Sequence, residues 1–244
     1  MIVMSIAGVD PSAGAGVYAD LKTFQAIGVY GTGIVTALTA QNPYKFFSAS
    51  PVSEEYIEEQ IDSVMDSYEV EFVKTGMLYS PEIIKMISKK ISQYDLKAVV
   101  DPVMVATSGG DLTKEDLADA LNKYLLPKAI LTTPNISEAE KLTGFEIKNS
   151  DDALKASKKI VCDNIITGGH LDGINTINID GDVFSEKQEL IESDNLHGTG
   201  CNLSSAIVAY LALNNDLKTS ILKSLDYVYE GIKNGNYGTL IAKI

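Results

Sequence analysis

The chain has 244 residues, of which 45% are hydrophobic and 22% charged; this composition is typical of a soluble globular protein and excludes wholesale disorder. Lys and Arg total 20 against 33 Asp and Glu, and the resulting net charge of −13 argues against a nucleic-acid-binding protein. The sequence has two cysteines, no apolar run of about 18 residues and no basic N-terminal region, so we expect a cytoplasmic location and no membrane partner.

Short β-branched runs alternate along the chain with longer segments of helical spacing. Several of these runs are apolar at consecutive positions, which is typical of parallel strands that are buried on both faces. The predicted strands are residues 2–7, 33–39, 72–75, 98–101, 129–132 and 164–167.

Helix starts lie between these strands. Ser53 precedes an acidic first turn, and Ser80 precedes a proline, which is typical of an N-cap followed by proline at the first helical position. From Gly198 the pattern is helical nearly to the end of the chain. Residues 46–52 and 173–186 indicate extended pairs instead, and therefore antiparallel strands at the flanks of the sheet.

This order predicts a three-layer α/β fold, with a mostly parallel central sheet, helices on both faces and a few antiparallel flanking strands. No linker, repeat or low-complexity tract interrupts the alternation. Residues 1–244 are therefore predicted to form a single domain.

The first candidate site is a glycine-rich segment, residues 8–16 (GVDPSAGAG), between the first strand and a helix. Glycines let the backbone approach a ligand closely, and a helix start offers unpaired amides. The segment does not match the G-x-G-x-x-G dinucleotide pattern, and on spacing alone a tight strand-to-helix turn explains it equally well.

Two polar motifs follow later strands. Asp101 ends a predicted central strand, where open α/β sheets bind ligands and where a carboxylate could orient magnesium through water. A turn or helix cap explains Asp101 equally well. Asn135 and Glu138 are three residues apart and would share one face of a helix start. They could hold a hydrated cation, or they could cap the helix.

The strongest candidate is His197-Gly198-Thr199-Gly200-Cys201, which opens a helix of small and apolar residues. Its first amides would point into space beside glycines, which predicts an anion hole. In this first turn we expect the helix N-terminus to lower the pKa of the Cys201 thiol. A buried inert cysteine is the alternative, which the preceding Gly-x-Gly pattern disfavours.

Seven stretches spread over nearly the whole chain carry a family resemblance. They are residues 8–22 (GVDPSAGAGVYADLK), 30–42 (YGTGIVTALTAQN), 74–78 (KTGML), 101–109 (DPVMVATSG), 133–144 (TPNISEAEKLTG), 168–171 (GGHL) and 197–204 (HGTGCNLS). In this order they resemble the ribokinase superfamily and, within it, the hydroxymethylpyrimidine and phosphomethylpyrimidine kinases of thiamine biosynthesis. The resemblance implies a ribokinase-like fold, a shallow substrate site partly covered by a flap, and ATP with Mg²⁺.

The resemblance also implies roles for individual residues. For the pyrimidine substrate these are Gly8, Asp10, Gln41, Met77 and, on the apolar side, Val103. For ATP they are Asn135, Glu138, Thr167, Gly169 and His197; for Mg²⁺ they are Asp101 and Glu138. The catalytic set is Gly198, Thr199 and Gly200, which form the anion hole, together with Cys201. A monovalent cation and a homodimer are left open, and Thr167 stands where family members tend to carry lysine.

The two acceptors of such a kinase differ in their proton count. The hydroxymethyl group of the free pyrimidine has a proton to lose, so Cys201 could act as its base. The monophosphate is already largely ionised at neutral pH, because its second pKa is about 6. Two alternatives remain at this stage: a pyridoxal or pyridoxine kinase, and a non-catalytic pyrimidine-binding regulatory domain.

Overall fold

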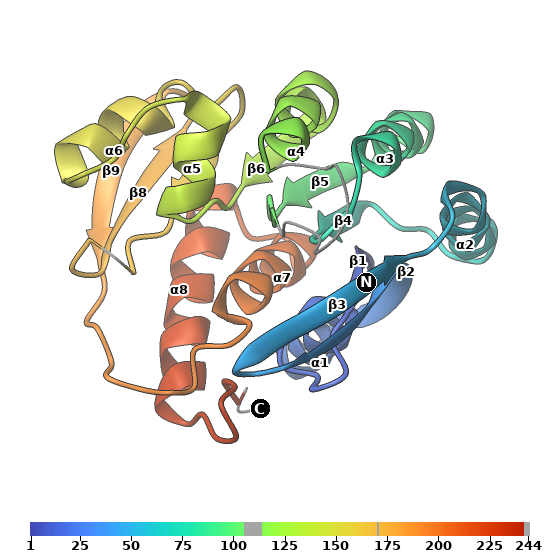
Figure 1. The fold of residues 1–244 in the computed structure, drawn as a ribbon, viewed down its shortest axis with the longest axis horizontal. Helices are drawn as coiled ribbons and strands as arrows, with labels where there is room; N and C mark the ends of the chain where they lie inside the picture. The colour runs from blue at the N-terminus through green and yellow to red at the C-terminus, as the bar shows by residue number, and fades with distance from the viewer. Residues whose placement is uncertain (105–113, 170, 242–244) are drawn as a thin grey trace.

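The computed structural model describes residues 1–104, 114–169 and 171–241, and within them nine strands form one sheet in the order β3-β2-β1-β4-β5-β6-β7-β8-β9 (Figure 1). The strands are β1 (Ile2–Val9), β2 (Tyr30–Asn42), β3 (Lys45–Pro51), β4 (Phe72–Thr75), β5 (Lys97–Val100), β6 (Ala129–Thr132), β7 (Asn164–Ile166), β8 (Ile174–Ile179) and β9 (Asp182–Lys187). The six central strands, from β2 through β1, β4, β5 and β6 to β7, pair in parallel. At the flanks, β3 runs antiparallel to β2, β8 to β7 and β9 to β8. The predicted mostly parallel sheet with antiparallel flanks is confirmed.

Helices cover both faces of the sheet (Figure 1). One face carries α1 (Gly16–Ile27), α7 (Thr199–Ala212) and α8 (Leu217–Lys233). The other carries α2 (Glu54–Ser67), α3 (Pro81–Gln93), α4 (Lys114–Ala120), α5 (Ile136–Thr143) and α6 (Ser150–Ser157); α4 continues through a π-helical segment, Leu121–Leu125, and a 3-10 turn, Leu126–Lys128. In the part of the chain that the structure describes, no helix is long and apolar enough to cross a membrane.

Strand β5 shows why the central strands are apolar at consecutive positions. Ala98 and Val100 pack into the core on the side of α2, α3 and α4, whereas Val99 packs into the opposite core with residues of α1 and α7. All three side chains are fully buried. A strand that is covered on both faces has no solvent side and needs no polar alternation.

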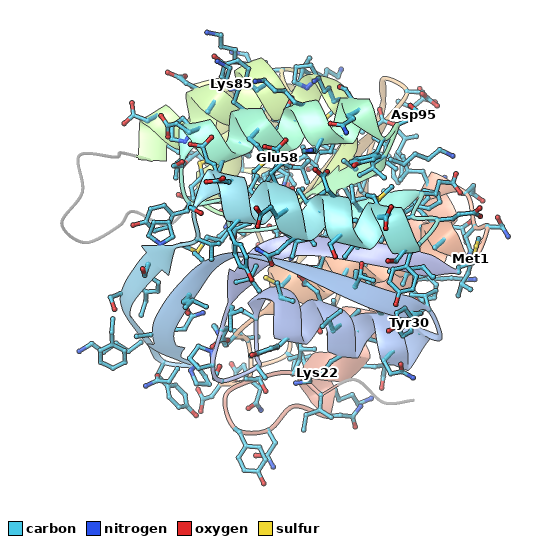
Figure 2. All side chains as sticks on the ribbon, turned by 90° about the vertical axis from the view of Figure 1, so that its right-hand side faces the viewer. Met1, Lys22, Tyr30, Glu58, Lys85 and Asp95 are labelled. Carbon is cyan, nitrogen blue, oxygen red and sulfur yellow. The ribbon has the colours of Figure 1, made fainter. Side chains whose placement is uncertain are left out.

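The expected helix starts are present. The Ser53 hydroxyl accepts a hydrogen bond from the Tyr56 amide at the start of α2, and Ser80 does the same for Ile83 at the start of α3. Figure 2 views the molecule from the side of α2, whose outer face carries exposed acidic side chains such as Glu58. The predicted helical C-terminal part ends with α8, because residues 234–241 form a non-helical turn.

The parallel strands place the candidate residues along one edge of the sheet, because the carboxyl ends of parallel strands all lie at the same edge. In sheet order, the residues that end or follow these strands are Asp10 after β1, Met77 after β4, Asp101 after β5, Asn135 after β6 and Thr167 after β7. Two parts of the predicted motifs, residues 105–109 and His170, lie outside the described residues.

Candidate active site

Gly8 and Met77 lie side by side near the ends of β1 and β4. A Cβ at Gly8 would lie 3.4 Å from the Met77 sulfur and 3.4 Å from the Ala37 carbonyl oxygen. The Thr36 hydroxyl donates to the Met77 carbonyl at 2.6 Å and so fixes the loop after β4. Both distances are ordinary contacts, so a side chain is not excluded at this position, but glycine presents bare backbone that a flat ring could approach closely.

Gln41 and Val103, the other two residues expected at the ring, come from two other elements. Gln41 is half-buried near the end of β2, where the pairing with β3 changes register. Val103 is half-buried after β5, and its amide donates to the Asp101 carbonyl at 2.8 Å. The Gln41 amide group can both donate and accept a hydrogen bond, which suits a ring nitrogen next to an exocyclic amine.

Asp10 holds the β1–α1 turn together. Its carboxylate is fully buried and accepts hydrogen bonds from the Ser12 amide at 2.9 Å, the Ser12 hydroxyl at 2.8 Å and the Ala15 amide at 2.9 Å. His197 Nε2 lies 2.7 Å from the same carboxylate. His197 therefore lies near the end of β1, whereas Asn135 and Thr167, the other residues expected to bind ATP, follow β6 and β7 farther along the same edge of the sheet.

The start of α7 has no side-chain cap. Gly198 is the N-cap, with φ +84°, and the amide of Asn202 is the first to bond back to its carbonyl. The Thr199 amide, which was expected to line the anion hole, instead donates to the Leu196 carbonyl at 3.3 Å, whereas within the described residues no acceptor takes the amide hydrogens of Gly200 and Cys201. Such free amides at the positive end of a helix form an anion-binding site.

Two buried charges, which the sequence reasoning did not single out, lie beneath this helix start. Lys74 Nζ donates to both Asp20 carboxylate oxygens, at 2.9 and 3.0 Å, and both side chains are fully buried. Asp20 also accepts hydrogen bonds from the hydroxyls of Ser5 and Ser205. Burial alone would lower the pKa of Lys74, but Asp20 raises it above its usual value. The available signal was a lysine inside the apolar strand Phe72–Thr75.

Asp101 and Cys201 meet beside this ion pair. Asp101 is 4% exposed, accepts a hydrogen bond from Ser204 at 3.3 Å, and would lie 3.9 Å from a Cβ at Gly200. Burial raises the pKa of Asp101 to about 6, although Lys74 opposes the shift. Burial likewise raises the pKa of the Cys201 thiol to about 12, with Lys74 acting against it. The lowered thiol pKa expected from the sequence is therefore wrong, because desolvation outweighs the helix N-terminus.

The loops after β6 and β7 form a second, more open group. Asn135 and Glu138 make a complete capping box at the start of α5: the Glu138 amide donates to Asn135 Oδ1 at 3.0 Å, and the Asn135 amide donates to the Glu138 carboxylate at 2.9 Å. Thr167 lies against this segment, with its amide bonded to the Pro134 carbonyl. A Cβ at Gly169 would meet no atom within 4 Å.

Asn135 and Glu138 therefore cap α5, as one of the two interpretations of the sequence expected. Their roles toward ATP and Mg²⁺ stay predictions. Within residues 1–104, 114–169 and 171–241, no three His, Cys, Asp or Glu side chains are grouped so that they could hold a metal ion.

Comparison with known proteins identifies the family to which this chain is similar. The model of the phosphomethylpyrimidine kinase family matches residues 10–241. The hydroxymethylpyrimidine/phosphomethylpyrimidine kinase of Bacillus subtilis is 35% identical over 240 residues, which cover 95% of this chain and 89% of that one. The protein of the same name from Rhizobium meliloti is 39% identical over 239 residues and is covered to 90%.

Solved structures share the fold. An ADP complex of Bacillus subtilis pyridoxal kinase superposes with a TM-score of 0.90 at 33% identity, covering 99% of this chain and 96% of that one. A phosphomethylpyrimidine kinase from Clostridium difficile superposes with a TM-score of 0.81 at 35% identity, covering 94% and 100%. The architecture is that of the ribokinase-like kinases, and the protein is a phosphotransferase. The chain belongs to the phosphomethylpyrimidine kinase family.

Proposed function

We propose that this protein uses ATP to phosphorylate hydroxymethylpyrimidine and then its monophosphate, giving the pyrophosphate used in thiamine biosynthesis. The observation that carries the proposal is the start of α7, where two free amides lie beside the buried Asp101 and the half-buried Cys201. Phosphoryl transfer depends on positioning and charge stabilisation more than on covalent chemistry, and free helix-start amides supply both. Relatives named for this activity cover the chain almost completely.

The row of loops suggests how the two substrates lie. The pyrimidine ring binds over Gly8 and Met77, with Gln41 at its polar edge, which directs its hydroxymethyl group toward Cys201. ATP binds over the loops after β6 and β7, so that its terminal phosphate reaches the α7 amides. In-line transfer between the two then follows the edge of the sheet from β7 toward β1.

Mg²⁺ is proposed as the accompanying ion, and the oxygen donors near the ends of the central strands fit it. Asp101 supplies a buried carboxylate, and Thr75 and Thr133 on the flanking segments carry buried hydroxyls without a hydrogen-bond partner among the described residues. Hard oxygen ligands and bound water are what this ion prefers. When bound, it would neutralise charge on the transferring phosphate; Asp101 and Glu138 are the residues that would hold it.

Cys201 meets the two acceptors differently. Because burial keeps the thiol protonated, it can take the proton of the hydroxymethyl group only after losing its own. Asp101, which is hydrogen-bonded to it, offers an acceptor, and Lys74 favours the thiolate. The attacking oxygen of the monophosphate needs no base, since it is already ionised.

A single assay tests the proposed activity against pyridoxal, which the similarity to pyridoxal kinase structures makes the competing acceptor. ADP release is measured with hydroxymethylpyrimidine, its monophosphate and pyridoxal, each alone and in competition. We expect higher kcat/KM for both pyrimidines. Preferential turnover of pyridoxal would replace the proposed substrate, and ligand binding without any ADP release would indicate a regulatory domain.

Gln41→Ala tests the ring position. The lost hydrogen bond at the ring edge should weaken pyrimidine binding by about 1–3 kcal/mol and leave ATP binding unchanged. Calorimetric titration with each ligand separates the two effects. An equal loss of ATP affinity would show that Gln41 does not contact the ring.

A further inference from the structure

The loop that leads into α7 is held from two sides at His197. On one side, His197 Nε2 lies 2.7 Å from the buried Asp10 carboxylate of the β1–α1 turn. On the other side, its backbone amide donates to the Gly238 carbonyl at 3.3 Å, and the residue forms a bridge with Thr239. A single residue therefore joins the start of α7, the β1–α1 turn and the C-terminal turn.

The backbones on either side of this residue touch without side chains between them. A Cβ at Gly198 would lie 1.7 Å from the Gly14 carbonyl oxygen, which no real side chain could tolerate. A Cβ at Gly14 would lie 2.6 Å from His197 Cδ2 and 2.4 Å from Thr239 Cγ2. The helix start thus packs in close backbone contact with the β1–α1 turn, and the imidazole bond adds a directional link to Asp10.

Asp10 is a strong and permanent acceptor for this bond. Burial would raise its pKa, but hydrogen bonds from His197, Ser12 and Ala15 lower it to about 2. The carboxylate is fully buried, and the imidazole is only 19% exposed, so water competes little for either group. A charge-assisted hydrogen bond in such surroundings is short and directional.

We propose that His197 is a positioning residue, whose hydrogen bond to Asp10 aligns the free amides of α7 with the substrate carried beside the β1–α1 turn. This inference rests on the proposed function and differs from the ATP contact that the sequence resemblance implied for His197. Gly8 is the next-to-last residue of β1, the strand that leads into Asp10, and Gly198 follows His197 directly. The bond therefore ties the ring region to the phosphate region. A displacement of about 1 Å between reacting groups can cost up to about 10²-fold in rate.

The test compares His197→Ala and His197→Asn, which remove the bond, with His197→Gln, whose Nε2 can reach the same carboxylate. We expect kcat to fall about 10- to 100-fold in the first two variants for both pyrimidine acceptors, with KM for ATP changed less than twofold. His197→Gln should recover most of kcat. Urea unfolding of each variant identifies any that is not folded. If His197→Ala does not fold, the comparison of kcat between His197→Gln and His197→Asn still tests the inference.

Three results would overturn the inference: wild-type kcat in His197→Asn, a glutamine variant no better than asparagine, or a raised KM for ATP at normal kcat. The last result would indicate that His197 contacts ATP, as the sequence resemblance implied. The wild-type protein is first assayed with all acceptors, and the variants are then compared on the acceptor that it turns over best. Turnover of pyridoxal alone would thus reject the proposed substrate, while the kcat ratios still test His197.

Discussion

The two ends of the active-site edge are built differently. Around β1, β4 and β5, the charged groups are buried: Lys74 and Asp20 are fully buried and bonded to each other, and Asp101 is 4% exposed and bonded to Ser204. Around β6 and β7, Asn135 is exposed, Gly169 faces open space, and the polar groups mainly cap α5. The first region already has its polar groups bonded within the protein, whereas the second leaves room for contacts that we propose a ligand would make.

This difference follows from what each region must do. Dipoles and charges that stabilise a transferring phosphate act best when they are fixed in a water-poor site, because they need no reorganisation during the reaction. A nucleotide must enter and leave in every turnover, and an exposed site allows this. The buried region should therefore be sensitive to single substitutions in both rate and stability, and the open region mainly in KM for ATP.

Cys201→Ala should give the largest effect on rate. Loss of a general base should lower phosphorylation of hydroxymethylpyrimidine by about 10²–10⁴-fold, whereas phosphorylation of the monophosphate should fall much less. Steady-state kinetics with both acceptors measures this split. Cys162→Ala is the matched control, because Cys162 lies before β7, at the opposite end of the strands. Equal losses for the two acceptors would leave the anion hole as the only function of this segment.

Lys74→Met should give the largest effect on stability. It leaves the Asp20 carboxylate buried without its cation and should lower the free energy of unfolding by about 3–5 kcal/mol. The Asp20→Asn/Lys74→Met double variant should recover much of this loss in urea unfolding. Lys97→Met is the control, because its ion pair with Glu71 is about half exposed and should contribute less than about 1 kcal/mol. If Lys74→Met lowers the free energy of unfolding no more than Lys97→Met does, the buried ion pair does not stabilise this region as expected.

Asp101→Asn should separate stability from activity. The folded pKa of Asp101 is about 6 against an ordinary 3.8, so the native state holds its proton more tightly than the unfolded chain does. That stabilisation is complete below pH 3.8 and is lost as the pH rises through 6, which leaves an ionised, unfavourably buried carboxylate at pH 8. Asparagine should therefore stabilise the metal-free protein by about 2–3 kcal/mol at pH 8 and by almost nothing near pH 3.8.

Kinase activity of Asp101→Asn should fall strongly at the same time. Urea unfolding at both pH values, with a chelator present, measures the stability difference, and ADP release measures activity. A variant that is less stable than the wild type at pH 8 would show that Lys74 outweighs the cost of burying this carboxylate.

The strands and helix starts were predictable because each has a local cause. Short β-branched runs predicted β4 and β6 with correct bounds, and Ser53 and Ser80 marked two helices. The Asp20–Lys74 pair was not found, because its partners are 54 positions apart and meet only through the sheet. The direction of the Cys201 pKa was wrong for a related reason: the helix start is visible in sequence, but the depth of burial is not.

Asn135 offers the smallest and most selective test of the open region. Its Oδ1 caps α5, whereas its Nδ2 makes no hydrogen bond within the described residues and is free to meet a phosphate. Asn135→Ser keeps a good N-cap but loses the amide donor, so the free energy of unfolding should be unchanged while KM for ATP rises about 2- to 10-fold. Asn135→Ala loses both functions and should also cost about 1 kcal/mol of stability. If KM for ATP rises in the alanine variant alone, Asn135 acts only through the helix cap, and the nucleotide side depends on backbone groups rather than on this side chain.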